Sequence, residues 1–215
     1  LIRGPLLYDV RISGKKGEGR MQLRSVIIAL AIGMNTSVFA GGFDDASAAY
    51  GAKDYRTAFS RWMFFAEQGS SDAQYNIGLM YFYGQGVRRD YAQAAKWYLV
   101  SAQQGDAYAQ NNIGMMYHQG YGVPQDYYQA LKWYRLAAEQ GLGEAQHNLA
   151  RYYHKGKSVL KDHVQAHAWF NLAAVNGAVN AAQERDALAE EMTPRQIEEA
   201  QKFARDCLSR DYKGC

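Results

Sequence analysis

A period of 36 residues constrains the fold of this chain more than any other feature of its sequence. The hexapeptide at 73–78, Ala-Gln-Tyr-Asn-Ile-Gly, returns at 109–114 as Ala-Gln-Asn-Asn-Ile-Gly and at 145–150 as Ala-Gln-His-Asn-Leu-Ala. A glycine closes each unit, at Gly105, Gly141 and Gly177. A constant period of this length is typical of chains built by stacking one small unit on the next. We therefore expect a repeat architecture.

Each unit is predicted to contain two helices, called helix A and helix B. Ala73, Ile77 and Tyr81 are four residues apart, which places them on one face of helix A. Asp90 precedes helix B and is a natural N-cap, and Gly105 can take the left-handed conformation that ends the helix. Glycine inside helix A, at Gly78 and again at Gly114, predicts a close approach between helices.

The flanking sequence extends the array at both ends. Ala46, Ala49 and Tyr50 precede a helix B that begins near Asp54, and Thr193-Pro194 begins a last helix that gives the stack a polar end. The expected whole is all-α, an α-α superhelix of about ten helices. We divide the chain into an upstream stretch at 1–20, a signal peptide at 21–40, an N-terminal tetratricopeptide-like half-unit at 41–70, three repeats at 71–105, 106–141 and 142–177, and C-terminal capping helices and tail at 178–215.

These residues carry a family resemblance. The pattern Ala-x-x-x-Ile/Leu-Gly-x-x-Tyr-x-x-Gly-x-Gly-Val, then Asp, then Ala-x-x-Trp-Tyr-x-x-Ala-Ala-x-x-Gly resembles the Sel-1-like repeat and covers residues 43–205. That family is similar to tetratricopeptide repeats, with a longer loop between the two helices. The resemblance implies a right-handed solenoid and an adaptor or regulator role in an exported bacterial protein.

An export signal is predicted to begin at Met21. A short positive segment around Arg24 is followed by an apolar run from Val26 to Met34, and small residues precede cleavage after Ala40. The alternative is a retained membrane anchor, but a spanning helix needs roughly 20 apolar residues and this run is shorter. We expect no stable membrane insertion after cleavage and a periplasmic or secreted product. Residues 1–20 are interpreted as translated upstream sequence.

Charge weighs against nucleic acid as a partner. Residues 1–40 hold 6 of the 24 Lys and Arg residues but only 2 of the 21 Asp and Glu residues. The remaining chain keeps 18 basic and 19 acidic residues, so its net charge is close to zero. The two cysteines, Cys207 and Cys215, are expected to form a disulfide in an oxidising compartment. A redox-active pair is the alternative, although the Cys-x-x-Cys spacing is missing.

A partner surface is predicted from the helix A positions that differ between copies. These positions are separated by four and three residues and lie opposite the invariant apolar stripe. They are Tyr75, Leu79, Phe82, Asn111, Met115, His118, His147, Arg151 and His154. The set changes from apolar to basic along the array, so we hypothesise a protein or peptide ligand with a hydrophobic end and an acidic end. Solvent-facing variation is the alternative.

Other candidate chemistry is interpreted as structural. Asn76, Asn112 and Asn148 could contact a ligand backbone, but a repeated Asn more often joins neighbouring repeats. His163 and His167 have the spacing of a metal pair without a third ligand nearby in the chain. Trp97, Trp133 and Trp169 could form a sugar-stacking surface, but their period favours a core position. We expect no catalytic residues, no metal and no cofactor.

The leading functional hypothesis is a non-enzymatic scaffold for protein–protein interaction, which regulates an envelope sensor or assembly or acts on a host protein. The alternative is cell-wall or carbohydrate binding with weak β-lactam hydrolysis, as suggested for cysteine-rich relatives of the family. Those relatives carry a cysteine pair in each repeat, whereas both cysteines of this chain follow the repeats.

Overall fold

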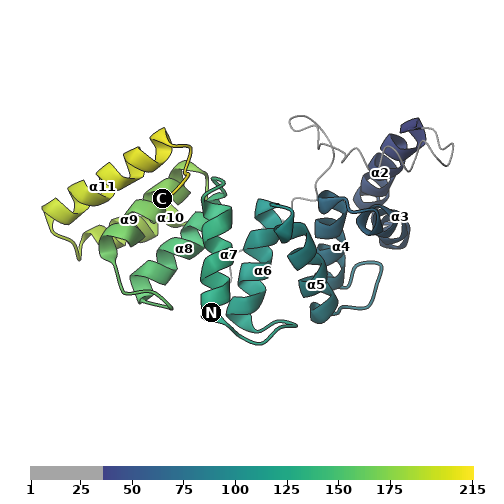
Figure 1. The fold of residues 1–215 in the computed structure, drawn as a ribbon, viewed down its shortest axis with the longest axis horizontal. Helices are drawn as coiled ribbons and strands as arrows, with labels where there is room; N and C mark the ends of the chain where they lie inside the picture. Colours follow the sequence, from purple (N-terminus) through teal and green to yellow (C-terminus); the bar gives the residue numbers. More distant parts are fainter. Residues whose placement is uncertain (1–35) are drawn as a thin grey trace. The chain divides into compact units, whose positions relative to one another are not determined.

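The structure, a computed structural model, describes residues 36–215, with side chains from residue 42 onward. This part of the chain holds ten helices: α2 (Thr36–Gly51), α3 (Tyr55–Glu67), α4 (Ser71–Tyr83), α5 (Tyr91–Gln103), α6 (Ala107–Gln119), α7 (Tyr127–Ala138), α8 (Gly143–Lys155), α9 (His163–Val175), α10 (Ala181–Ala189) and α11 (Pro194–Ser209) (Figure 1). The predicted all-α class and the expected number of helices are confirmed. The predictions for residues 1–20 and for the signal peptide lie outside the described residues, apart from the backbone of 36–40 in α2.

The helices pack as sequential pairs within two compact units. Unit 1 ends at Trp97 and unit 2 comprises Tyr98–Cys215. In unit 1, α3 packs against both α2 and α4. In unit 2, α7 packs against α6 and α8, and α9 packs against α8, α10 and α11. This order is that of a helical repeat, while the right-handed sense of its coil stays a prediction.

Aspartate side chains begin the helices of type B, as predicted. The carboxylate of Asp90 accepts from the backbone N–H groups of Ala92 and Gln93 at 2.9 and 3.0 Å. Asp54, Asp126 and Asp162 cap α3, α7 and α9 in the same way. Each bond satisfies a backbone donor that the first turn of a helix leaves unpaired. An aspartate N-cap therefore begins each helix B, in α3, α5, α7 and α9.

The glycine of helix A permits close packing in unit 2. A Cβ atom added to Gly114 would lie 3.0 Å from the ring of Tyr134 and 3.3 Å from the carbonyl oxygen of Ala130. Both of those residues belong to α7, the helix B of the same repeat. The predicted close approach of helices A and B is confirmed at this position.

A buried glutamine joins each helix A to the helix that precedes it. The side-chain amide of Gln146 donates to the carbonyl oxygen of Ala138 at 3.1 Å, and Gln74 and Gln110 make the equivalent bonds to Ala66 and Ala102. The last carbonyl groups of a helix lack a partner in the next turn, and each of these three also accepts from the N–H of the glycine that follows its helix. Each glutamine therefore adds a second hydrogen bond to a carbonyl group at the end of the preceding helix and satisfies its own buried amide.

The core of the helix pairs is formed by an aromatic residue four positions after the invariant alanine of helix B. Its members are Trp62, Tyr98, Tyr134 and Phe170, each at most 3% exposed. The neighbouring tryptophans differ, because Trp97 and Trp133 are only partly buried. Trp169 is 1% exposed and its ring lies 6.2 Å from that of Phe203 in α11. The prediction of a core position is therefore confirmed for Trp169, and Trp97 packs against the core cluster of unit 1 while remaining partly exposed.

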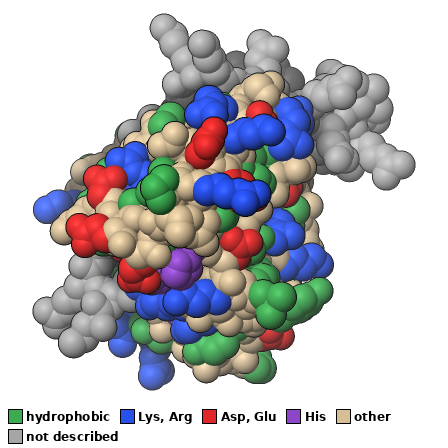
Figure 2. Space-filling view, turned by 90° about the vertical axis from the view of Figure 1, so that its left-hand side faces the viewer, with side chains coloured by type: hydrophobic (Ala, Val, Ile, Leu, Met, Phe, Trp, Pro, Cys, Tyr) green, Lys and Arg blue, Asp and Glu red, His purple; other side chains and the backbone are tan. Residues whose placement is uncertain are grey.

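The C-terminal end of unit 2 is closed by α11. Thr193 and Gln196 form a reciprocal capping box around Pro194, as the sequence predicts for the start of this helix. Figure 2 faces this end, where Lys and Arg side chains are interspersed with Asp and Glu. The apolar side of α11 packs on α9 through Ala200 and Ala204. A charged outer surface of this kind ends a stack of repeats.

The chain after α11 folds back onto the third repeat. Cys207 and Cys215 form the predicted disulfide. Between them the hydroxyl of Tyr212 is 3.0 Å from the Asn176 side-chain nitrogen, and the Tyr212 ring lies against Gly141. Asn176 also donates to Gln146, at 2.9 Å. The tail is thus connected, through Asn176, to Gln146, the buried glutamine that joins α8 to α7.

Candidate protein-binding face

The apolar third of the predicted partner surface is buried. Tyr75, Leu79 and Phe82 of α4 are 3, 4 and 9% exposed. The Phe82 ring lies 5.1 Å from that of Tyr91, which begins α5. The expectation that these three side chains form an accessible hydrophobic end was wrong, because the side of α4 that carries them is buried.

The composition of α4 explains this burial. From Tyr75 to Phe82 the helix carries apolar or aromatic residues on every side, and nine of its thirteen residues are buried. A helix that is apolar all round belongs in a core, whereas a surface helix keeps one polar face. At the same positions the equivalent helices α6 and α8 carry polar residues, apart from Met115, and all of these positions except the buried Asn111 are only partly covered.

The other six predicted residues lie in unit 2, and we call them the helix-A stripe. They are Asn111, Met115 and His118 of α6 and His147, Arg151 and His154 of α8. Asn111 is 9% exposed and the other five are half-buried. The side-chain amide of Asn148 donates to Asn111 Oδ1 at 3.0 Å, which places the two helices side by side. Asn148 therefore joins neighbouring repeats, as its recurrence predicts, whereas the side-chain amide of the buried Asn76 has no hydrogen-bond partner among the described residues.

His118 lies at the centre of an aromatic cluster. Its ring is 5.2 Å from the Tyr127 ring and 5.5 Å from the Tyr152 ring, and Nδ1 is 2.7 Å from the Tyr152 hydroxyl. Burial lowers the pKa of His118, and Lys157, Arg151 and Lys155 lower it further through their positive charges. Burial also raises the pKa of Tyr152. A protonated tyrosine hydroxyl therefore donates to a neutral imidazole at neutral pH.

The basic end of the stripe shares a carboxylate from the capping helix α10. Glu184 Oε1 lies 3.1 Å from His147 Nε2, and Oε2 lies 3.9 Å from Arg151 Nε. Burial lowers the pKa of His147 more than Glu184 raises it. At neutral pH this end therefore consists of an uncharged imidazole and an arginine whose charge is offset. It is less basic than the residue types alone indicate.

His154 extends the stripe toward the loop before α9. Its ring stacks on that of His163 at a centroid distance of 5.8 Å. Burial lowers the pKa of His154, whereas the negative charge of Glu191 opposes that shift. All three stripe histidines are thus held toward the neutral form by loss of water contact.

Comparison with known proteins identifies the repeat. The Sel1 repeat profile matches residues 71–106, 107–142 and 143–177. A Sel1 repeat protein from Oxalobacter formigenes has a similar structure, with a TM-score of 0.65 and 30% identity over 76% of this chain and 74% of that one. This chain belongs to the Sel1 repeat family.

A second similar structure comes from Escherichia coli and is described as a protective antigen of uropathogenic strains with the same repeat fold. It has a TM-score of 0.67 and 33% identity to this Sel1 repeat protein over 73% of the chain. The chain spans about a third of the length of the E. coli protein, 34%. No curated protein sequence matches the chain. Sel1 repeats usually bind proteins, which fits a scaffold.

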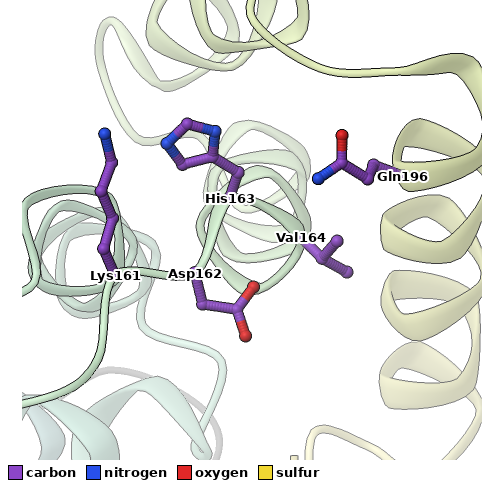
Figure 3. A pocket seen from close by; sticks show the side chains of 5 residues that line it. All are labelled: Lys161, Asp162, His163, Val164 and Gln196. Atoms are coloured by element: carbon purple, nitrogen blue, oxygen red, sulfur yellow. The ribbon is translucent and has the colours of Figure 1, made fainter.

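A recess of about 360 Å³ lies where the loop before α9 faces α11 (Figure 3). It is lined by Lys161, Asp162, His163, Val164 and Gln196. Two of its polar groups are engaged elsewhere, because Asp162 accepts from the Gln165 N–H and Gln196 Oε1 accepts from the Thr193 N–H. The recess is open to solvent and brings together no nucleophile and base of the kind that an active site needs.

The two histidines that are spaced one helical turn apart lie in different surroundings in this Sel1 repeat protein. His167 is buried at 4% exposure, whereas His163 lines the open recess. Across residues 36–215, no group of three His, Cys, Asp or Glu side chains is placed to hold a metal ion. Within the same residues, none of the helices combines the length and the apolar run that crossing a bilayer requires.

Two residues of the face escaped sequence reasoning. Glu184 occurs once, in the capping helix, so no comparison between repeats could reveal it. Tyr152 was overlooked because the sequence comparison relied on the recurring tyrosine beside it, Tyr153. A signal for Tyr152 did exist, because the same position holds Met80 and Met116, which are both buried.

Proposed function

We propose that this Sel1 repeat protein is a scaffold that binds a partner protein through the helix-A stripe of unit 2. The stripe is a continuous surface, because α6 and α8 are joined by the Asn148–Asn111 bond and α10 contributes Glu184 beside them. Five of its six side chains are half-buried, so they are held in position but still reach solvent. Preorganised side chains of this kind lose little conformational entropy on binding.

The single observation that carries the proposal is that the invariant and the variable positions of helix A differ in burial. The invariant alanines and aliphatic residues, such as Ala109, Ile113 and Leu149, are fully buried, whereas five of the six stripe positions are not. The variable positions of unit 2, apart from Asn111, therefore keep part of their surface in solvent, whereas those of α4 do not, although Met115 also packs against the core. In unit 2 they are available to a partner.

We further propose that the protein acts outside the cytoplasm, in the periplasm or after secretion, on an envelope sensor, an envelope assembly or a host protein. The Cys207–Cys215 disulfide supports this location, because disulfides persist in oxidising compartments and are rare in the cytosol. The similar E. coli protein described as a protective antigen is consistent with exposure to a host.

Photocrosslinking in intact cells tests the binding face. A photoreactive amino acid at Met115, on the stripe, is compared with one at Tyr128, which is 66% exposed on α7. We expect a discrete crosslinked protein from position 115 that is absent from position 128. The same crosslinked protein should weaken when Arg151→Glu reverses a stripe charge.

Two outcomes contradict the proposal. Equal crosslinking from positions 115 and 128 would mean that the stripe is not a preferred contact. A crosslink confined to position 128 would move the interface to the helix B side. Circular dichroism of each variant controls for loss of helix.

A further inference from the structure

The stripe brings three histidines onto one face of a protein that has only five. They are His118, His147 and His154, and Arg151 lies between the last two on the same helix. Arg151 also acts electrostatically on both His118 and His147, which shows that the groups share one field. A histidine can change its charge between pH 5 and 8, so the field of this face depends on pH.

The charged groups that face these rings come from every element packed around them. On the basic side they are Arg151 and Lys155 of α8 and Lys157 and Lys161 of the following loop, and on the acidic side Glu144 of α8, Glu184 of α10 and Glu191 beyond it. A further titratable group is His163 of α9, whose ring stacks on that of His154. Four cations against three carboxylates leave one net positive charge. Protonating the three histidines would raise this to four net positive charges.

Protonation also changes what Glu184 does. In the neutral state its carboxylate is the anion beside both His147 and Arg151. A protonated His147 lies closer to Glu184 than Arg151 does, at 3.1 Å against 3.9 Å, so it takes the larger share of that carboxylate. Arg151, with a quarter of its side chain exposed (24%), then becomes available to another carboxylate.

The other two histidines respond in the same direction. His118 Nδ1 accepts from Tyr152 when neutral, and the surrounding groups are Lys157, Lys155 and Arg151 without a carboxylate acting on it. His154 Nδ1 is buried without a hydrogen-bond partner among the described residues. Each added proton at these positions is compensated only in part by the protein, so an anionic ligand gains a favourable partner.

From these contacts we infer that the helix-A stripe recognises an acidic peptide segment and takes up protons as it binds, so that recognition strengthens on acidification. The inference rests on the proposed function of the stripe as a protein-binding face, and adds the chemistry of the partner. By linkage, a ligand that binds better to the protonated protein must raise proton affinity on binding. Uptake of one proton per peptide changes the dissociation constant about tenfold per pH unit where the histidines titrate.

The test uses the purified protein and a rhodamine-labelled octapeptide of alternating Glu and Ala, with a Gln-Ala peptide as the uncharged control. Glutamate has an ordinary pKa of about 4.3, so the probe stays ionised at pH 5.5. We expect binding of the Glu peptide, measured by fluorescence anisotropy, to be at least about tenfold tighter at pH 5.5 than at pH 7.5. The Gln peptide should bind more weakly and without this dependence.

Variants assign the effect to the stripe. Combining His118→Gln, His147→Gln and His154→Gln should reduce the change between the two pH values to less than about twofold, because no proton is then taken up. Lys132→Gln, an exposed charge on α7, should retain the full change. If circular dichroism shows that the triple variant does not fold, the single variants His147→Gln and His154→Gln should each reduce the slope of log Kd against pH.

The inference is overturned if the Glu peptide does not bind, if both peptides bind equally, or if the histidine variants keep the full pH dependence. These failures are distinguishable from failure of the proposed function. A crosslink from position 115 that persists alongside any of them would leave the binding face in place and remove only its acidic, proton-linked selectivity.

Discussion

Replacing Gln146 with alanine tests the connection between the second and third repeats. Gln146 is fully buried, donates to Ala138 at 3.1 Å and accepts from Asn176 at 2.9 Å. Each hydrogen bond contributes about 1 kcal/mol net. The Ala138 carbonyl also accepts from the Gly141 N–H, so it is not left entirely unpaired. Lost packing of the removed atoms adds about 1 kcal/mol.

We therefore expect Gln146→Ala to lower the free energy of unfolding by about 3 kcal/mol. The measurement is urea unfolding followed by circular dichroism at 222 nm. Gln183→Ala, an exposed glutamine in α10, is the matched control and should change the free energy by less than about 0.5 kcal/mol. If the two variants unfolded at the same urea concentration, the buried glutamine would not be what joins the repeats.

Three further predictions follow from the packing. Leu79→Ala should destabilise the protein by about 2–4 kcal/mol in urea unfolding, because the side chain is 4% exposed, whereas Leu160→Ala, at 91% exposed, should have no measurable effect; similar effects would contradict the burial of α4. Gly143→Ala places a Cβ 2.6 Å from the Asn176 carbonyl oxygen and should lower the thermal midpoint, while Gly51→Ala meets nothing within 4 Å and should not; the reverse order would refute the close approach. The stripe histidines have lowered pKa values in the folded state, so the unfolded chain binds more protons than the folded protein as the pH falls. Their contribution to the free energy of unfolding is complete above about pH 6.5 and should decline below it. A urea midpoint that is higher at pH 5 than at pH 7.5 would disprove this.

Local chemistry made much of the fold predictable. Helix caps such as Asp90 and the Thr193–Pro194 start act within one turn, so residue type and spacing were sufficient to place them. The recurrence of glycine at Gly114 likewise indicated a close contact, because an added Cβ would lie only 3.0 Å from the Tyr134 ring. The Cys207–Cys215 bond was predicted from the short spacing of the two cysteines and from the expected export.

Burial was harder to predict because it depends on neighbours distant in the sequence. Leu79 and Met115 occupy the same repeat position, yet only Leu79 is fully buried. Variation between repeats was interpreted as exposure, but a core position can also vary when each copy fills a different space. The apolar character of α4 on every side was the sequence signal that favoured burial.

The charge of the site was also beyond sequence reasoning. His147 and Arg151 indicated a basic surface, but the pKa of an imidazole depends on how much water it loses and on the charges around it. Glu184, from a helix outside the three repeats, provides the compensating charge. Only the structure placed it there.

The central claim, that helix A of unit 2 contacts the partner, is tested most directly with the protein identified by crosslinking. Titration calorimetry would compare Met115→Asp on α6 with Leu136→Asp on α7, where Leu136 is 38% exposed. We predict at least about tenfold weaker binding for Met115→Asp, which corresponds to 1.4 kcal/mol, and a change of less than about twofold for Leu136→Asp. Equal losses, or a loss confined to Leu136→Asp, would contradict the account.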